Sequence, residues 1–487
     1  MLFNSIDFAL FLPIVFVLYW FVVNRNLKAQ NGLVLIASYF FYGWWDWRFL
    51  FLIAFSSFVD FFIGMKLGKS ENDTQRKWLL ATSIFVNIGF LGFFKYFNFF
   101  SESLTNAFSF MGQPIDNPFL LNVILPVGIS FYTFQTLSYS IDVYKRKLEP
   151  TNDIFAFLAF VSFFPQLVAG PIERATNLLP QFYKKRVFEY EKAADGMRQI
   201  LWGLFKKVVI ADNCAAYAND IFNNSADYSG STLFLGAVFF AFQIYGDFSG
   251  YSDIAIGTSR LFGFNLMQNF AFPYFSRDIA EFWRRWHISL STWFRDYIYI
   301  PLGGSRGGTW MKVRNTFIIF IVSGFWHGAN WTFVAWGALN AIYFLPIMLL
   351  ERNRLNTDTI AAGKWLPNFK EVYQVGATFF FTCIAWVFFR ADSTLHAVQY
   401  ISTIFSRSLL SVPEVFPKKI LLLIVIFLAV EWIQREKPHG LFIESNNSGG
   451  LANLAGYKGV RWAAYCGIAF VILFWGGSQQ EFIYFQF

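Results

Sequence analysis

The sequence predicts an all-α fold, that of a polytopic helical membrane protein, and its composition is the first reason. Of the 487 residues, 56% are hydrophobic and 14% are charged, whereas a soluble domain carries about 25% charged residues. Aromatic residues make up 22% of the chain, and Trp and Tyr favour the interfaces between lipid and water. About a dozen apolar segments have roughly the length that crosses a bilayer. These observations exclude a water-soluble protein.

The first apolar segment, residues 6–24, is predicted to be a retained span. No Lys or Arg precedes it and no small-residue cleavage site follows it, so it does not resemble a signal peptide. The later candidate spans share its apolar character and lie at 30–45, 49–64, 78–94, 120–143, 198–221, 231–250, 315–328, 331–350, 374–390, 418–433 and 460–477.

Two further segments complete the predicted layout. Residues 153–170 are apolar but are interrupted by Pro165 and followed by Gly170 and Pro171, which indicates a span or a re-entrant segment. The polar stretch 351–371 is expected to be a loop. Neither a repeat nor a linker to a soluble domain is visible, so residues 1–487 are expected to form a single membrane domain.

The basic residues predict an orientation. They gather in the loops after the first, third and fifth spans, as Arg25, Lys28, Lys66, Lys69, Arg76, Lys77, Lys145, Arg146 and Lys147. The alternate segments carry Arg48 and Lys95. The positive-inside rule therefore places the N-terminus outside. The net charge of +8 is expected from loops that face anionic lipid, and we expect no nucleic-acid partner.

Several classes of site are excluded by the sequence. Cys214, Cys383 and Cys466 are far apart and form no CxxC motif, which excludes a disulfide framework and a cysteine-based zinc site. The chain has no GxSxG elbow, Walker A loop, HExxH motif or EF-hand loop. Two histidines without further ligands make a weak metal site, so we expect no metal.

Residues 281–297 are predicted to form an amphipathic helix. At about 100° per residue, Phe282, Trp286, Leu290, Trp293 and Tyr297 share one face. Arg284, His287, Ser291 and Arg295 share the opposite, cationic face. Glu281 and Arg285 have the spacing of a helical ion pair. Two interpretations stay open: an interfacial helix whose arginines meet lipid phosphates, or a helix that lines a cytoplasm-facing cavity for an anionic acyl donor.

His327 lies deep in the apolar segment NTFIIFIVSGFWHGANWTF, residues 315–333. A helix would place it about 20 Å from Arg314, past the middle of a bilayer core. An ionisable residue at that depth is a functional hypothesis by default, although a structural hydrogen bond between helices is the alternative. Gly324 and Gly328 allow a close approach or a helix break, and a neutral imidazole can act as a general base. We expect the other two histidines, His396 and His439, to be solvated.

Two motifs resemble the signature of the membrane-bound O-acyltransferase (MBOAT) family, in its alginate O-acetyltransferase-like branch. They are EFWRRWHISLSTWFRDYIYIPLGGSRGG (281–308) and SGFWHGANW (323–331). Supporting similarity lies in the opening segment, LVAGPIERA (167–175), GDFSGYSDIAIGTSRLFGF (246–264), NFAFPYFSRDI (269–279) and EFIYFQF (481–487). The glutamate of GPIERA differs from the residue expected in alginate enzymes, which leaves the acceptor polymer open.

The resemblance implies a fold and a function. The fold is a ring of transmembrane helices around a thinned centre, with a tunnel through the membrane. His327 takes the catalytic role and His287 an assisting or donor-positioning role. The expected substrate-binding residues are Arg284, Arg285, Ser291, Arg295, Asn330, Trp326 and Trp286.

The resemblance also implies the substrates and partners. The donor is a cytoplasmic acyl thioester, most simply acetyl-CoA, used as a substrate and not held as a permanent cofactor. The partners are an extracytoplasmic acetyltransferase, a polysaccharide and the lipid bilayer of the plasma (inner) membrane. Three alternatives remain open: transfer of D-alanine from a carrier protein, a transporter or flippase for an envelope precursor, and a non-catalytic scaffold. The absence of paired broken segments in two matching halves disfavours the transporter.

Overall fold

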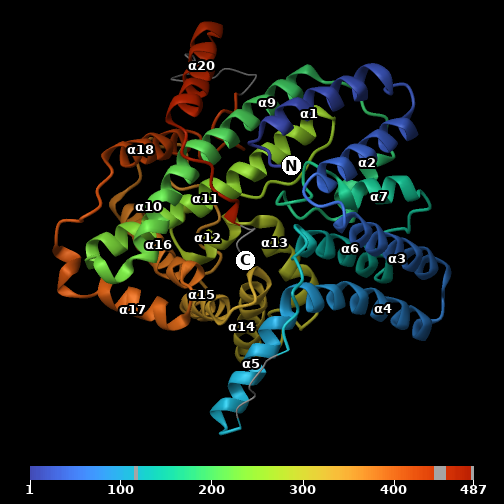
Figure 1. The fold of residues 1–487 in the computed structure, drawn as a ribbon. Helices are drawn as coiled ribbons and strands as arrows, with labels where there is room; N and C mark the ends of the chain where they lie inside the picture. The colour runs from blue at the N-terminus through green and yellow to red at the C-terminus, as the bar shows by residue number, and fades with distance from the viewer. Residues whose placement is uncertain (114–118, 444–456, 484–487) are drawn as a thin grey trace. The chain divides into compact units, whose positions relative to one another are not determined.

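The computed structural model describes residues 1–113, 119–443 and 457–483, and their regular elements are all helices (Figure 1). No strand occurs in these ranges, which confirms the predicted all-α class. The chain falls into two units. The first contains residues 1–188, 262–266 and 328–330, and the second contains the other described residues.

The first unit holds the N-terminal helices. In chain order they are α1 (Ile6–Val17), η1 (Leu18–Val22), α2 (Leu27–Gly43), α3 (Phe49–Lys69), α4 (Asp73–Leu91), η2 (Gly92–Tyr96), α5 (Phe97–Phe110), α6 (Ile129–Tyr144), α7 (Ile154–Ser162), α8 (Ala175–Leu178) and η3 (Leu179–Phe182). Helices α3 and α4 both pack against α6 (Figure 1). Asp60 of α3 joins the three helices because its carboxylate accepts hydrogen bonds from Ser83, Asn87 and Ser140.

Two predicted spans of this unit differ from the structure. The span predicted at 120–143 is wrong over its first part, because α6 begins only at Ile129. Pro126 and the left-handed Gly128 (φ 76°) precede the helix and prevent an earlier start. The span predicted at 78–94 belongs to one continuous helix of 38 residues, Asp73–Phe110. The segment 153–170 is interrupted as predicted, since α7 ends at Ser162 and turns follow.

The second unit holds the remaining helices. They are α9 (Tyr190–Leu204), η4 (Phe205–Ala211), α10 (Asp212–Asn223), η5 (Ser225–Asp227), α11 (Gly230–Leu261), η6 (Pro273–Phe275), α12 (Ile279–Arg285), α13 (Ile288–Phe294), η7 (Arg295–Tyr299), α14 (Gly308–His327), α15 (Trp331–Leu349), α16 (Phe369–Arg390), α17 (Thr394–Ile404), η8 (Arg407–Leu410), α18 (Lys418–Ile433) and α20 (Lys458–Trp475).

Within the described residues, six helices are long and apolar enough to cross a membrane. They are Phe49–Lys69, Asp73–Phe110, Gly230–Leu261, Trp331–Leu349, Phe369–Arg390 and Lys458–Trp475. This number supports a multi-pass helical membrane protein. The larger number of spans expected from the sequence stays a prediction.

Glycines bring α9 and α11 into close contact, and the two helices run side by side (Figure 1). A methyl group added to Gly196 would collide with the carbonyl oxygen of Gly257, and one added to Gly203 would collide with that of Gly250. The two pairs repeat every seven residues, so they lie on one face of each helix. Small residues of this kind let membrane helices pack backbone to backbone.

Buried ion pairs hold the middle of α11. Lys207 of η4 lies 2.6 Å from Asp247 and 2.8 Å from Asp212. The other carboxylate oxygen of Asp247 accepts a hydrogen bond of 2.7 Å from the backbone N–H of Ile483. The last described residues are therefore attached to α11, whose next side chain, Phe248, packs against His287.

Candidate active site

The segment predicted as one amphipathic helix is broken in the structure. Helix α12 begins after Asp278, whose side chain caps the N–H of Glu281, and ends at Arg285. Trp286 is extended, His287 takes the left-handed conformation (φ 43°, ψ 54°), and α13 begins at the next residue. The prediction of a continuous helix over 281–297 is therefore wrong.

A neighbouring backbone segment accounts for the break. The N–H of Ile288 donates to the carbonyl of Asn269 (2.9 Å), and the N–H of Ala271 donates to the carbonyl of Arg285 (3.0 Å). Through these two bonds the chain around His287 is tied to residues 269–271 and does not continue its own helical ladder. The contact is tertiary, so local periodicity gave no sign of it.

The break separates His287 from the cationic face on which the sequence placed it. Its side chain is 1% exposed, and its Nδ1 lies 3.1 Å from Oδ1 of Asn269. Its ring centroid lies 4.6 Å from that of Phe248 and 6.2 Å from that of Trp326. The predicted aromatic face is nevertheless buried: Phe282, Trp286, Leu290 and Trp293 all lie in the core.

His327 is the last residue of α14 and is 5% exposed. Its ring centroid lies 4.9 Å from that of Trp326, 5.2 Å from that of Phe389 and 5.4 Å from that of Trp336. The helix stops at His327, and α15 begins at Trp331. The two buried imidazoles, His287 and His327, are close enough to interact electrostatically.

Gly324 determines how closely α14 approaches α15, one turn before His327. A methyl group on Gly324 would collide with the carbonyl oxygen of Phe333, and one on Gly337 would collide with that of Phe320. The two helices run side by side (Figure 1). The close approach expected at Gly324 is thus confirmed, with the backbone of α15 as the neighbour.

A cavity of about 590 Å³ opens beside α12, α13 and α14. Three of the residues expected to bind substrate line it, namely Arg284, Ser291 and Arg295. Lys312 and Arg354 add two basic groups that the sequence analysis missed. Three of the arginines that line it, Arg284, Arg295 and Arg354, are exposed, whereas the lining residues Phe320, Ser323 and Met348 are buried. A basic rim above an apolar interior suits a ligand with an anionic end and a slender neutral arm.

The basic residues at the cavity are held by nearby acceptors. Arg284 donates to the carbonyls of Asn353 (2.7 Å) and Asn356 (2.6 Å). Arg295 donates to the adjacent Asp296 at 2.7 Å. Lys312 lies 3.8 Å from Glu351. Asp296 and Glu351 thus offset the charge of two basic groups at the cavity. An incoming anion would compete with these carboxylates for Arg295 and Lys312.

An ion-pair cluster ties α12 to the connection before α16. The ion pair predicted between Glu281 and Arg285 is confirmed at 2.9 Å. Glu281 also pairs with Arg277 at 3.0 Å, and Arg277 reaches Asp358 at 2.9 Å. The hydrogen bond from Arg277 holds the pKa of the Asp358 carboxyl below its usual range.

The cavity comes within one helical turn of His327. Ser323, four residues before His327 on α14, lines it. Trp283 lines it as well, and its ring lies 5.7 Å from Trp336, which in turn lies 5.4 Å from His327. Steps of three or four residues back from His327 along α14 pass through Ser323, Phe320 and Thr316 to Lys312. This helical spacing is the signal by which Lys312 could have been found.

The other expected substrate-binding residues lie elsewhere. Arg285, Trp286 and Trp326 do not line the cavity; Arg285 is paired with Glu281, and both indoles are buried. Asn330 is half-buried in the connection Gly328–Asn330, which groups with the first unit.

One of the two remaining histidines contradicts its prediction. His439 is buried, and its Nε2 lies 3.2 Å from Oδ1 of Asp195. The expectation that it is solvated is wrong because this carboxylate offers the ring a partner inside the protein. His396 is partly exposed on α17 and lies 3.1 Å from the hydroxyl of Ser225.

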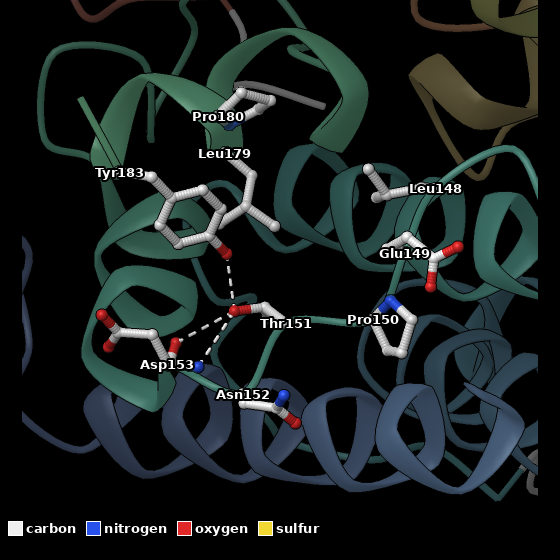
Figure 2. Close-up of a pocket in the computed structure, with 9 residues that line it drawn as sticks. All are labelled: Leu148, Glu149, Pro150, Thr151, Asn152, Asp153, Leu179, Pro180 and Tyr183. Atoms are coloured by element: carbon white, nitrogen blue, oxygen red, sulfur yellow. Dashed lines mark hydrogen bonds between the residues drawn. The ribbon is translucent and has the colours of Figure 1, made fainter. Parts of the chain in front are cut away.

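A smaller cavity of about 350 Å³ lies in the first unit, between the 148–153 connection and η3 (Figure 2). Thr151 stands at its centre and accepts a hydrogen bond of 2.5 Å from the hydroxyl of Tyr183. Its two charged lining residues, Glu149 and Asp153, are both acidic. This cavity is therefore unsuited to an anionic donor, and the larger cavity is the better candidate.

The fold and site define a class of protein: a multi-pass helical membrane protein with two buried histidines near a basic-rimmed cavity. Residues 148–388 match the model of the MBOAT, membrane-bound O-acyltransferase, family. The chain belongs to this family and is an O-acyltransferase.

Three relatives illustrate the range of similarity. The probable alginate O-acetylase AlgI of Pseudomonas aeruginosa is 42% identical over 83% of this chain and 75% of its own length. The peptidoglycan O-acetyltransferase of Helicobacter pylori is 36% identical over 82% of this chain and 79% of its own length. The teichoic acid D-alanyltransferase of Bacillus subtilis is 27% identical over 60% of this chain and 75% of its own length.

Proposed function

We propose that this protein moves an acetyl group from a cytoplasmic thioester to hydroxyls of an extracytoplasmic polysaccharide, directly or through a partner acetyltransferase. The observation that carries the proposal is the cavity whose rim holds Arg284, Arg295 and Lys312 and whose interior reaches Ser323, one turn from His327. In such a cavity an anionic carrier can bind at the basic rim, while its slender arm reaches inward and holds the reacting carbonyl.

His327 acts as the general base in this proposal. Its neutral imidazole accepts the proton of the acceptor hydroxyl while the hydroxyl oxygen attacks the thioester carbonyl. The carbon–sulfur bond then breaks, and the departing thiolate takes the proton back from the imidazolium. The acyl group ends on oxygen as an ester, and the donor leaves as a free thiol. His287, buried nearby, assists by positioning one of the two substrates.

Acetyl-CoA is the donor that best fits the rim. Its pyrophosphate and phosphate groups match guanidinium groups, which bind such anions with two hydrogen bonds at once. The donor enters and leaves as a substrate, so the protein needs no permanently bound cofactor. No nucleic acid takes part.

The names of the relatives support an acetyl group and an envelope polymer. Those named as alginate or peptidoglycan acetylating enzymes are 36–42% identical to this chain, whereas those named as teichoic acid D-alanyltransferases are 27–31% identical. Transfer of D-alanine from a carrier protein is therefore the second candidate.

The proposed setting is the plasma (inner) membrane, with the N-terminus outside. Residues 1–487 act as a single MBOAT domain in which about a dozen segments ring a thinned centre, with a tunnel that joins the two membrane faces. The tunnel lets the acyl arm meet an acceptor from the other side, while the charged carrier stays in the cytoplasm.

The test uses inverted membrane vesicles that contain the full chain and the native envelope polymer. Acetyl-CoA labelled in the acetyl group is expected to leave base-labile label on the polymer, while D-alanyl carrier protein is expected to leave none. Label found only on the polymer with the D-alanyl donor would support the second candidate. Transport of an envelope precursor without covalent transfer of either label would contradict an acyltransferase role.

A further inference from the structure

Asn269 contacts the turn around His287 through both its backbone and its side chain. Its carbonyl accepts a hydrogen bond from the N–H of Ile288 (2.9 Å). Its side-chain Oδ1 lies 3.1 Å from Nδ1 of His287, 2.8 Å from the hydroxyl of Ser289 and 3.4 Å from the N–H of Ser289. Asn269 is fully buried, so no water competes for these groups.

The orientation of the Asn269 amide follows from these partners. A backbone N–H can only donate, so the amide atom that faces Ser289 must be the oxygen. The amide nitrogen then points the other way, where it donates to the hydroxyl of Ser252 at 3.0 Å. The hydroxyl of Ser289 also lies 3.4 Å from Nδ1, but it donates its hydrogen to Oδ1 of Asn269 at 2.8 Å. Both neighbours of Nδ1 can then only accept, so these hydrogen bonds require a proton on Nδ1.

The opposite nitrogen of His287 has a different environment. Nε2 is buried and has no hydrogen-bond partner among the residues that the structure describes. His287 also keeps a left-handed backbone conformation, which is uncommon for residues other than glycine. A conformation of this kind persists where the surroundings enforce it, and such positions cluster at functional sites.

We propose that Asn269 is a positioning residue that fixes His287 in the Nδ1–H tautomer, so that Nε2 offers a lone pair to a substrate. The inference rests on the proposed function and states that His287 accepts a hydrogen bond from the substrate and does not donate one. In this tautomer Nε2 accepts a hydrogen bond from a substrate hydroxyl or amide N–H. It cannot donate one to the oxyanion of a tetrahedral intermediate, which must be stabilised by other groups.

The direct test is a nitrogen NMR measurement on the full chain in lipid nanodiscs, without substrate. The chain has four histidines, so ¹⁵N-histidine labelling gives few signals, and a His287→Gln variant assigns those of His287. At about pH 8, where an ordinary imidazole is neutral, we expect a protonated Nδ1 and an unprotonated Nε2. A protonated Nε2 in the wild-type protein would overturn the proposal.

The variants test the part played by Asn269. Asn269→Ala keeps the backbone bond to Ile288 but removes the Oδ1 acceptor, so we expect His287 to populate the other tautomer. Asn269→Asp keeps an acceptor and should keep the proton on Nδ1. Ser252→Ala is the matched control, because it removes the other partner of the same amide and leaves His287 untouched. An unchanged tautomer in Asn269→Ala would overturn the role of Asn269.

Kinetic measurements distinguish a variant that positions His287 poorly from one that folds poorly. We expect Asn269→Ala to lower kcat by roughly tenfold or more, and Asn269→Asp to restore part of the rate. Equal losses in both variants would contradict the proposal. If Asn269→Ala does not fold, the wild-type spectrum still decides the tautomer. The spectrum needs no turnover, so its result is independent of whether the proposed acyl transfer is correct.

Discussion

Two segments of the second unit each bring one buried histidine to the candidate site, and they do so in different ways. His327 ends a regular helix of 20 residues, α14, whose position depends on close backbone packing with α15 at Gly324. His287 lies in a break between two helices of seven residues each, held by contacts to Asn269. The first histidine is the last residue of a regular helix, whereas the second lies in a helix break that depends on a residue 18 positions away. The two histidines should therefore respond differently to substitution.

The largest effect is expected at His327. His327→Ala removes the proposed general base, and we expect the rate of acyl transfer to fall by roughly 10²–10⁴-fold at an unchanged protein level. His396→Ala is the control, because His396 lies on α17 with Ser225 as its partner. Label transfer from acetyl-CoA in vesicles measures both variants. Normal transfer by His327→Ala would contradict its assigned role.

The second-largest effect is expected on stability, from the packing of α14 against α15 near His327. Gly324→Ala places a methyl group against the carbonyl of Phe333, and we expect a loss of about 1–3 kcal/mol of stability. Gly376→Ala on α16 is the matched control, because an added methyl group meets nothing within 4 Å there. Thermal unfolding in detergent compares the two. A Gly324→Ala protein as stable as the control would show that α14 and α15 are not closely packed.

The cavity rim should give a smaller effect, confined to donor binding. Arg295→Ala removes one basic group from the rim, and we expect the KM for acetyl-CoA to rise by roughly three- to tenfold with kcat unchanged. Arg284 is less suitable for this test, because its hydrogen bonds to the carbonyls of Asn353 and Asn356 also hold that part of the chain in place. Arg407→Ala, an exposed arginine away from the cavity, is the control. Equal KM values for both variants would argue against donor binding at this rim.

The smallest effect concerns the ion-pair cluster near α12. The lowered pKa of Asp358 means that its pairing with Arg277 stabilises the fold above the unfolded-state pKa of about 3.9 and loses this contribution as the pH falls through the folded-state value. Asp358 is 65% exposed, so Asp358→Asn should cost only a few tenths of a kcal/mol at neutral pH. Unfolding temperatures of the two proteins should converge below about pH 4. If the difference in unfolding temperature between the two proteins did not change with pH, the ion pair would be ruled out as its source.

The comparison of the two histidines also shows what the sequence alone could predict. His327 was identifiable because an ionisable residue stands out in apolar sequence, and the Glu281–Arg285 pair because helical spacing is local. The break at His287 was not predictable, because residues 281–297 have a helical period. The hydrogen bonds that interrupt the helix come from the distant segment at Asn269. His439 was misjudged for a similar reason, since its partner Asp195 is distant in the chain. Patterns of short range were predictable, and contacts between distant segments were not.

The candidate membrane spans α11 and α20 differ in how much of each is buried inside the described part of the protein. Within its most apolar stretch, 83% of the residues of α11 are buried inside the protein, while none of those of α20 are. A helix enclosed by protein is largely insulated from the thickness of the bilayer, whereas an exposed one must match it by tilting or by deforming the lipid around it. If α20 lies in the bilayer, a cell that remodels its lipids with temperature thus changes the surroundings of α20 and leaves those of α11 nearly constant.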